Sequence, residues 1–251
     1  MKYQRFIQMK HLAVFVALLF AASGVEAQMG GAMVQGPQFT GPMAKLFGDH
    51  QAFSATLAFQ TEGGASGKSL TMGGSMAYLN GVTRFEMDMT KMQGANIKPQ
   101  AMAQMKRMGM DKIIVVSIPE KKVTRMMYPS MNAYVESALP DASSSGSATT
   151  DYKLSVTEIG SDTIDGHPCV KNKVVVTEPS GTLHESTVWN AKDMDKFPLK
   201  IEMSDNGKQV SMMFKDVKLD KPDAALFEPP AGSRKYDSMM DMMMSRARGG
   251  Q

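Results

Sequence analysis

The sequence predicts a mainly β protein of the α+β class, in which one large antiparallel sheet carries one or two short helices. Apolar and polar residues alternate through several segments, as they do in half-buried strands. Turn-forming pairs such as Asn80-Gly81 and Asp165-Gly166 separate these segments. No helical pattern alternates with the strands in a βαβ rhythm, and the connections are short, so neighbouring strands are expected to pair in a meander.

The N-terminus has the features of a cleavable secretory signal peptide. An apolar stretch at 12–22 is too short to span a bilayer, and it follows three cations, Lys2, Arg5 and Lys10. The tripeptide ending at Ala27 suits a signal peptidase, so the mature chain is expected to begin at Gln28 and to be soluble outside the cytoplasm. An uncleaved membrane anchor is the alternative. No cysteine follows the apolar stretch to carry a lipoprotein anchor.

Charge and cysteine content limit the function classes. Removing residues 1–27 takes away three cations and Glu26, which lowers the formal net charge from +3 to +1. This balance lacks the basic surface that nucleic-acid binding usually needs, so no nucleic-acid partner is expected. Cys169 is the only cysteine, so no internal disulfide can form and an apolar core must stabilise the domain.

The elements follow in order along the mature chain. Residues 28–49 are expected to form a flexible arm and, from Pro42, one short helix. The first half then predicts strands at 53–59, 69–79, 82–90, 112–118 and 123–128, with an amphipathic helix at 98–108. A Ser-rich insertion at 141–150 is expected to be mobile. The second half predicts strands at 153–159, 170–177, 182–190, 199–203 and 209–214.

The second half also carries a series of motifs. They are GSDTIDGHPC at 160–169, WNAKD at 189–193, FPLKIE at 197–202, FKDV at 214–217 and PDAALFEPPAG at 222–232. This order resembles the periplasmic family of outer-membrane lipoprotein carriers, LolA and LolB, and their relatives of unassigned function. The resemblance covers about residues 50–236 and is most convincing from 153 to 236.

The resemblance implies a half-barrel, which is a strongly curved antiparallel sheet of about ten or eleven strands. Short helices on its concave side would close an apolar cavity that holds acyl chains. The arm, the Ser-rich insertion and a Met-rich tail at 237–251 are additions to that pattern. The implied function is periplasmic binding or carriage of a lipid or an acylated protein. The chain is expected to be a monomer that needs no cofactor, and the membrane surface is a further expected contact.

An acyl-chain site needs an apolar wall, and the predicted strands and helix supply candidates for it. Of the 26 methionines, 24 lie in the mature chain, and flexible, polarizable thioethers can adapt to variable apolar partners. Plain core packing is the alternative for each side chain, and for Trp189 in particular. The candidates are Phe53, Leu57, Phe59, Met72, Phe85, Met87, Met89, Met102, Met105, Trp189, Met212 and Phe214.

Copper binding is an alternative function, because thioethers are soft ligands that suit Cu(I). The tail places its methionines at helical spacing: Met239, Met240, Met242, Met243 and Met244. A terminal segment lying on the cavity mouth or on a membrane surface would explain the same residues. A structural role in the cell envelope is the remaining alternative.

Catalysis has little support in the sequence, and no catalytic residue is assigned. His167 and Cys169 lie two residues apart and would share one face of a strand, as a thiol and its base require. Pro168 separates them, and Asp165 is the only carboxylate near enough in sequence to orient the imidazole. A small buried thiol is the simpler interpretation.

Overall fold

The computed structural model describes residues 42–63, 69–94, 99–139, 152–178, 181–205 and 208–249. All of these belong to one compact unit that begins at Gln38. The predicted signal peptide, the arm before residue 42 and the insertion at 141–150 lie outside the described residues and stay predictions.

Strands dominate the described residues, with three short α-helices before, between and after them. In chain order the elements are α1 (Pro42–Lys45), β1 (Ala52–Gly63), β2 (Leu70–Leu79), β3 (Val82–Asp88), η1 (Met89–Lys91), β4 (Gln93–Gly94), α2 (Pro99–Arg107), β5 (Lys112–Ile118), η2 (Pro119–Lys121), β6 (Val123–Tyr128), η3 (Pro129–Met131), β7 (Ala133–Ala138), β8 (Lys153–Ile164), β9 (His167–Thr177), β10 (Leu183–Ala191), β11 (Pro198–Asp205), β12 (Lys208–Lys218), η4 (Ala224–Phe227), β13 (Arg234–Tyr236) and α3 (Met239–Gly249). The predicted helix at 98–108 is confirmed as α2.

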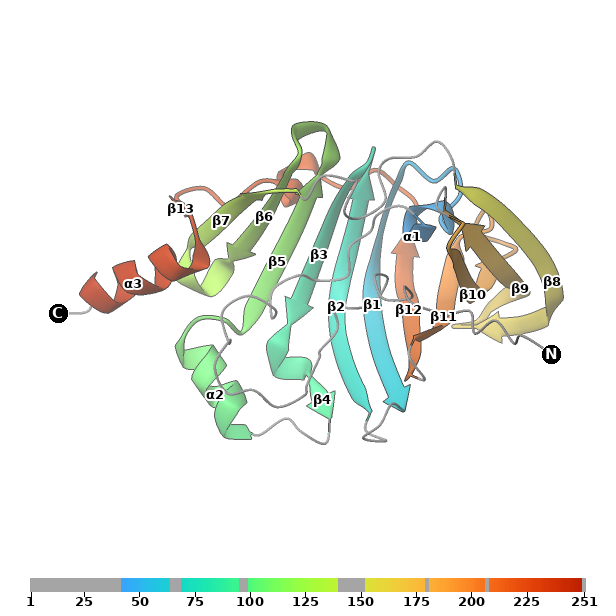
Figure 1. Ribbon diagram of the computed structural model, residues 1–251, viewed down its shortest axis with the longest axis horizontal. Coiled ribbons are helices and arrows are strands. Elements are labelled where there is room, and N and C mark those ends of the chain that lie inside the picture. The colour runs from blue at the N-terminus through green and yellow to red at the C-terminus, as the bar shows by residue number, and fades with distance from the viewer. Residues whose placement is uncertain are drawn as a thin grey trace, which may run out of the picture. The chain divides into compact units, whose positions relative to one another are not determined.

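The strands form one sheet in the order β13-β7-β6-β5-β3-β2-β1-β12-β11-β10-β9-β8, with the short β4 beside β2 (Figure 1). Neighbours pair antiparallel except β13, which lies parallel to β7. The mainly β prediction is therefore confirmed, with thirteen strands where ten or eleven were expected. The expected strong curvature is not confirmed, because the sheet is not strongly curled and its path stays open between β13 and β8.

Two hairpins turn at the pairs that the sequence marked. Asn80 and Gly81 have φ values of 46° and 88°, and Asp165 and Gly166 have values of 51° and 86°. Two consecutive residues with positive φ characterise the type I′ turn, whose twist matches that of the flanking strands. Asn, Asp and Gly tolerate this conformation, which explains why these pairs connect β2 to β3 and β8 to β9.

Two further connections share one design. η2 ends in Lys122 and η3 ends in Asn132, both with left-handed backbone, and each preceding strand is followed at once by a proline. Proline suits the first position of a short helical turn, and the left-handed residue reverses the chain direction. The second connection leads into β7, a strand that the sequence analysis did not predict.

The register of neighbouring strands brings apolar residues together on one face of the sheet. On β1, Leu57 lies opposite Gly74 of β2 and Phe214 of β12, while Phe85 of β3 lies opposite Val115 of β5. Phe47, just after α1, packs on this face, and so does Met242 of α3. We call it the helix face.

The opposite face is apolar only in the first half of the sheet. There, Ile114, Val116 and Met127 form a buried cluster, which Phe227 of η4 covers. Further along the sheet, on β1, the same face carries Thr56, whose hydroxyl donates a 3.1 Å hydrogen bond to Asp216. Burial on both faces explains the continuous apolar run in β5.

The last strand of the sheet, β8, is exposed along almost its whole length. Eleven of its twelve residues are exposed, and the exposed fractions of Leu154, Val156 and Ile159 are 46%, 54% and 51%. Among the described residues, its outer edge pairs with no other strand. At the other end of the sheet, β13 and α3 cover the edge of β7 (Figure 1).

Candidate ligand-binding face

Most of the predicted cavity residues lie together on the helix face. Phe59 of β1 lies opposite Met72 of β2 and Met212 of β12, and Leu57 lies opposite Phe214. Because alternate residues of a strand point to one face, these registers place apolar side chains from several neighbouring strands side by side. The eight residues on this face are Phe53, Leu57, Phe59, Met72, Phe85, Met87, Met212 and Phe214.

An aromatic cluster occupies the helix face beside α1. The ring of Phe47 stacks on Phe53 with 5.1 Å between centroids, and it meets Phe214 edge-on at 5.3 Å. Phe197, before β11, contacts Phe53 edge-on at 5.0 Å. Each such pair adds about 0.5–1.5 kcal/mol beyond its area burial. The sequence analysis did not select Phe47 or Phe197 as candidates, since neither lies in a predicted strand.

A second cluster lies where α3 packs on strands β5, β6 and β7. Its buried members are Ile113, Val115, Tyr128, Ala133, Val135 and Met242. Five further methionines are partly buried against them. With Met242 they form what we call the methionine cluster: Met87, Met89, Met126, Met131, Met239 and Met242. The sequence analysis selected Met87 and Met89 for the cavity wall. Both belong to this cluster, Met87 from β3 and Met89 from η1.

One side chain of α3 is wholly buried. Met242 is 0% exposed, whereas Met240 and Met244 are 64% and 46% exposed. Burying a methionine contributes about 2 kcal/mol, so Met242 is the main apolar anchor of the helix. The side-chain hydroxyl of Ser238 caps the first turn by accepting a 3.0 Å hydrogen bond from the Asp241 amide.

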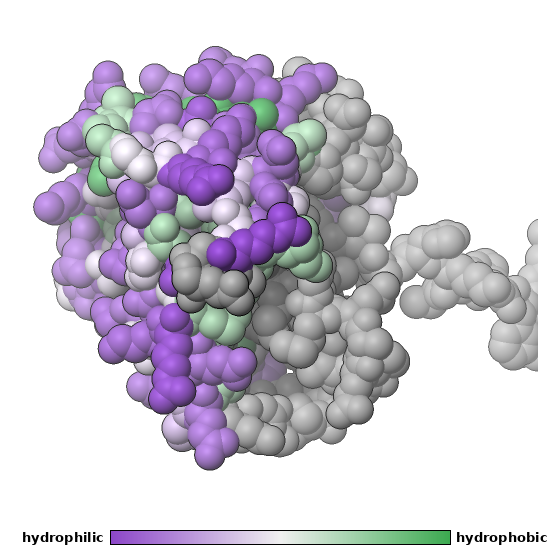
Figure 2. All heavy atoms as spheres, turned by 90° about the vertical axis from the view of Figure 1, so that its left-hand side faces the viewer, coloured by the Kyte–Doolittle hydropathy of each residue, from purple (hydrophilic) through white to green (hydrophobic). Residues whose placement is uncertain are grey.

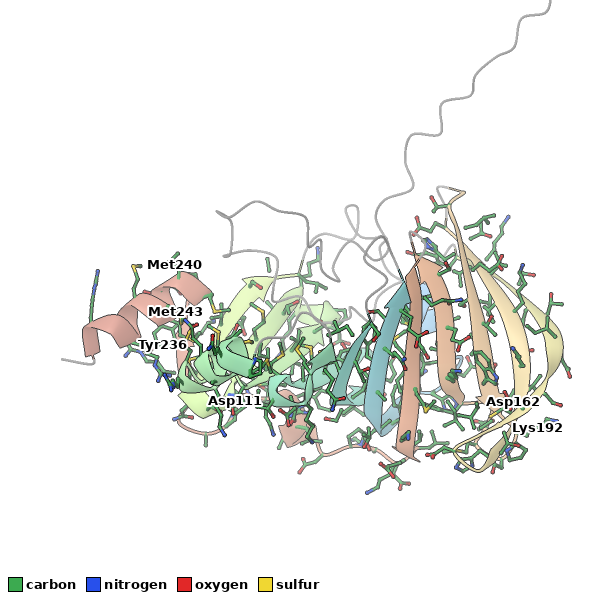
Figure 3. All side chains as sticks on the ribbon, turned by 90° about the horizontal axis from the view of Figure 1, so that it is seen from below. Asp111, Asp162, Lys192, Tyr236, Met240 and Met243 are labelled. Atoms are coloured by element: carbon green, nitrogen blue, oxygen red, sulfur yellow. The ribbon has the colours of Figure 1, made fainter. Side chains whose placement is uncertain are left out.

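The tail methionines therefore point to two sides of α3. Met239 and Met242 face the strands, while Met240 projects away from them (Figure 3). The end of the molecule seen in Figure 2 is mainly hydrophilic, with small apolar patches between polar side chains. The geometry does not bring the five tail thioethers to one point.

Tyr128 is the polar exception among the buried residues of this cluster. The side chain is 0% exposed, and its hydroxyl has no hydrogen-bond partner among the described residues. Burial raises the pKa of Tyr128, so the hydroxyl stays protonated and can donate. An unpaired buried hydroxyl is unfavourable by about 1–3 kcal/mol, and such groups in native structures call for an explanation.

The α2 methionines lie apart from the strand rows. Met102 and Met105 are half-buried, and α2 has no buried residue. Gly109 follows the end of α2 with a φ of +75°, and a Cβ there would lie 2.6 Å from Met131 Cγ and 3.4 Å from a guanidinium nitrogen of Arg246. The end of α2, η3 and the last turn of α3 therefore meet beside the methionine cluster.

Trp189 does not belong to the helix face, contrary to its selection as a cavity candidate. Its partner across β10 and β11 is Lys200, whereas the adjacent Val188 lies opposite the buried Ile201. The indole lies between Lys171 and Lys200, whose ammonium groups are 4.9 and 4.6 Å from the ring centroid.

The same indole also fixes a carboxylate of β8. Its Nε1 donates a 3.2 Å hydrogen bond to Asp162, which lies at the end of the sheet far from α3 (Figure 3). A backbone hydrogen bond from Thr163 and this indole bond lower the pKa of Asp162. Lys171, Lys200 and Asp162 thus surround Trp189 on the opposite face of the sheet. The alternation of residues along the strand does not show which of the two faces the indole occupies.

Cys169 lacks the environment of a nucleophile. The thiol is 0% exposed and donates to the carbonyl of His167 at 3.4 Å, and burial raises its pKa. Reactive cysteines have lowered pKa values and are accessible. The imidazole of His167 instead pairs with Asp193 at 2.9 Å, a carboxylate that the sequence analysis did not connect with it.

Within the ranges that the structure describes, no three His, Cys, Asp or Glu side chains group closely enough to hold a metal ion. None of the helices in those ranges has the length and apolar character needed to cross a membrane.

Comparison with known proteins gives structural similarity alone. No protein-family model matches the sequence, and neither does any curated protein. The structure is similar to that of the LolA superfamily protein NE2245 from Nitrosomonas europaea, with 12% identity, a TM-score of 0.41 and coverage of 73% of this chain and 93% of that one.

Two mycobacterial proteins are similar to this chain with comparable coverage and lower TM-scores. The lipoprotein LppX of Mycobacterium tuberculosis is 10% identical with a TM-score of 0.39, covering 70% of this chain and 93% of that one. LprF from Mycobacterium bovis is 11% identical with a TM-score of 0.32, covering 71% and 95%. The matches thus include the superfamily that the sequence motifs resemble, but similarity this low assigns no activity to the chain.

Proposed function

We propose that the mature chain binds or carries a hydrophobic ligand, a lipid or an acylated protein, on its helix face. The continuous apolar layer from Phe214 through Phe59 and Met72 to the methionine cluster carries this proposal, and its side chains are buried or partly buried in this structure. Burial of each ligand methylene is worth about 0.8 kcal/mol, so an acyl chain binds such a surface without any catalytic residue. Unbranched thioethers let the surface adapt to chains of different shape.

The setting of this function follows from the N-terminus. Export to the periplasm, with cleavage after Ala27, would place the mature chain between the inner and outer membranes. A monomer with no cofactor is sufficient for this activity. Copper binding by the tail gains no support, because Met240 and Met242 lie on different sides of α3.

The direct test is native mass spectrometry of the mature protein, purified gently from the periplasm and then extracted for lipids. A co-purifying acyl-chain species would support the proposal and identify the cargo. A clean protein mass, together with no uptake of added lipid, would contradict it.

A matched pair of variants locates the binding surface. Met87 is half-buried on the helix face of β3, and Met213 is half-buried on the opposite face of β12. Met87→Glu should weaken acyl-ligand binding at least tenfold, since it adds a charge to the apolar wall. Met213→Glu should leave the affinity unchanged. Equal effects of the two substitutions would contradict binding on the helix face.

A further inference from the structure

Helix α3 packs on an apolar site of the sheet that is rich in flexible side chains. We call this site, formed by the buried residues around Met242 and by the methionine cluster, the seat of α3. Met242 belongs to one buried cluster with Val115, Tyr128 and Val135, and the other members of the methionine cluster pack against it. Cores that must specify one arrangement favour branched or aromatic side chains, whereas methionine repacks readily. The composition of the seat therefore suits alternative occupants.

The attachment of α3 is local and depends on few groups. It is the last element of the described chain, it follows the three-residue strand β13, and Met242 alone among its methionines is wholly buried. An isolated helix of eleven residues is marginal in water, so α3 needs the seat in order to stay folded. Leaving the seat would therefore expose its backbone amides.

The seat also contains an unused hydrogen-bond donor. The Tyr128 hydroxyl is buried among apolar side chains and has no hydrogen-bond partner in the described part of the chain. A purely hydrocarbon ligand would leave it unpaired, whereas a carbonyl oxygen would accept its proton. The chemistry that satisfies both the apolar walls and this hydroxyl is an acyl chain that ends in an ester or amide carbonyl.

The geometry points to α3 as a displaceable plug: the acyl chain of the ligand takes the place of Met242, and Tyr128 donates a hydrogen bond to its carbonyl oxygen. This inference rests on the proposed function and specifies the site and the ligand class. The exposed Met240 and Met244 take no part in holding the plug in place.

Hydrogen exchange on the full mature chain tests the displacement. Methyl hexadecanoate is added, and amide exchange is followed in α3. Exchange at residues 242–248 should become faster on binding, because the displaced helix loses its seat. Unchanged or slower exchange in α3 upon binding would overturn the plug.

A pair of probes tests the hydroxyl. Methyl hexadecanoate and hexadecyl methyl ether differ at the carbonyl group, and each can displace the fluorescent reporter N-phenyl-1-naphthylamine. The wild-type chain should bind the ester about five- to tenfold more tightly than the ether, the range expected for one buried hydrogen bond. Tyr128→Phe should reduce this ratio to about one.

Tyr134→Phe is the matched control, since Tyr134 lies on the neighbouring strand but packs against the opposite face. It should retain the wild-type ester-to-ether ratio. A preference for the ester that survives Tyr128→Phe, or that is absent from the wild type, would overturn the inference while leaving the proposed function intact. Failure of both probes to bind the wild-type chain would contradict the proposed function itself.

Discussion

Arg125 and Glu136 join strands β6 and β7 through a 2.8 Å hydrogen bond from the guanidinium Nε to a carboxylate oxygen. The other carboxylate oxygen accepts a 2.8 Å bond from Lys235 of β13. Glu136 therefore connects three strands, one of which is the parallel strand that leads to α3. Hydrogen bonds from Lys235 and Arg125 lower the pKa of Glu136.

This lowered pKa predicts a loss of stability in acid. A carboxylate with a lowered folded-state pKa stabilises the fold above its unfolded pKa of about 4.3, and the contribution is lost as the pH falls through the folded-state pKa. Glu136→Gln should lower the free energy of unfolding at pH 7 by about 1 kcal/mol, with a smaller difference at pH 3. Urea denaturation at both pH values measures this.

Glu185→Gln provides the control for that measurement. Glu185 pairs with Lys173, and their side chains are 63% and 46% exposed. Exposed pairs contribute little, so this substitution should change stability by less than about 0.5 kcal/mol at either pH. If Glu136→Gln and Glu185→Gln lowered the free energy of unfolding equally, a structural role for the ion pairs of Glu136 with Arg125 and Lys235 would be contradicted.

Met242→Ala should destabilise the protein, because it leaves a cavity between α3 and the strands. Truncation of a fully buried methionine lowers the free energy of unfolding by about 2–5 kcal/mol, and local release of α3 would place the value near the lower limit. Met240→Ala, at a 64% exposed position of the same helix, should change it by less than about 0.5 kcal/mol. Thermal denaturation of the two variants checks the difference.

Substitution of the adjacent glycines of β2 by alanine should change the stability of the protein in opposite directions. A Cβ at Gly74 would lie 2.2 Å from the backbone oxygen of Glu86, so Gly74→Ala must shift strand β3 and should cost about 2 kcal/mol. A Cβ at Gly73 meets nothing within 4 Å, and Gly73→Ala should stabilise the strand by about 0.5 kcal/mol. Comparable unfolding midpoints for the two variants would contradict this packing.

The thiol of Cys169 should react only after unfolding. Its complete burial and raised pKa both reduce the concentration of accessible thiolate. Ellman's reagent should therefore label the native protein at least a hundredfold more slowly than the protein in concentrated urea. Rapid labelling of the native state would reopen a nucleophilic role for this residue.

Local sequence patterns were sufficient for most of the sheet. The type I′ pair Asn80-Gly81 fixed one hairpin, and alternation identified the apolar side of β1 and β3. The amphipathic pattern at 98–108 predicted α2 correctly, although that helix buries none of its residues. These features depend on backbone conformation and on contacts between neighbours in sequence, which is why they could be predicted.

Features that depend on distant partners could not be predicted in this way. β7 is short, and it is paired with β13 about a hundred residues later in the chain. Trp189 alternates correctly within β10, but only pairing with Lys171 and Lys200 shows which face it occupies. A local signal could have located β7. Pro129 and the left-handed Asn132 repeat the arrangement of Pro119 and Lys122, which precedes β6.

The two ends of the sheet differ in a way that limits self-association. β13 and α3 shield the edge of β7, while the long edge of β8 remains available for backbone pairing. If two copies pair through β8, each uses the long exposed edge of the described sheet, and the end formed by the three-residue β13 and by α3 offers less backbone to a third copy. Strand addition is therefore expected to favour a closed pair over a fibre.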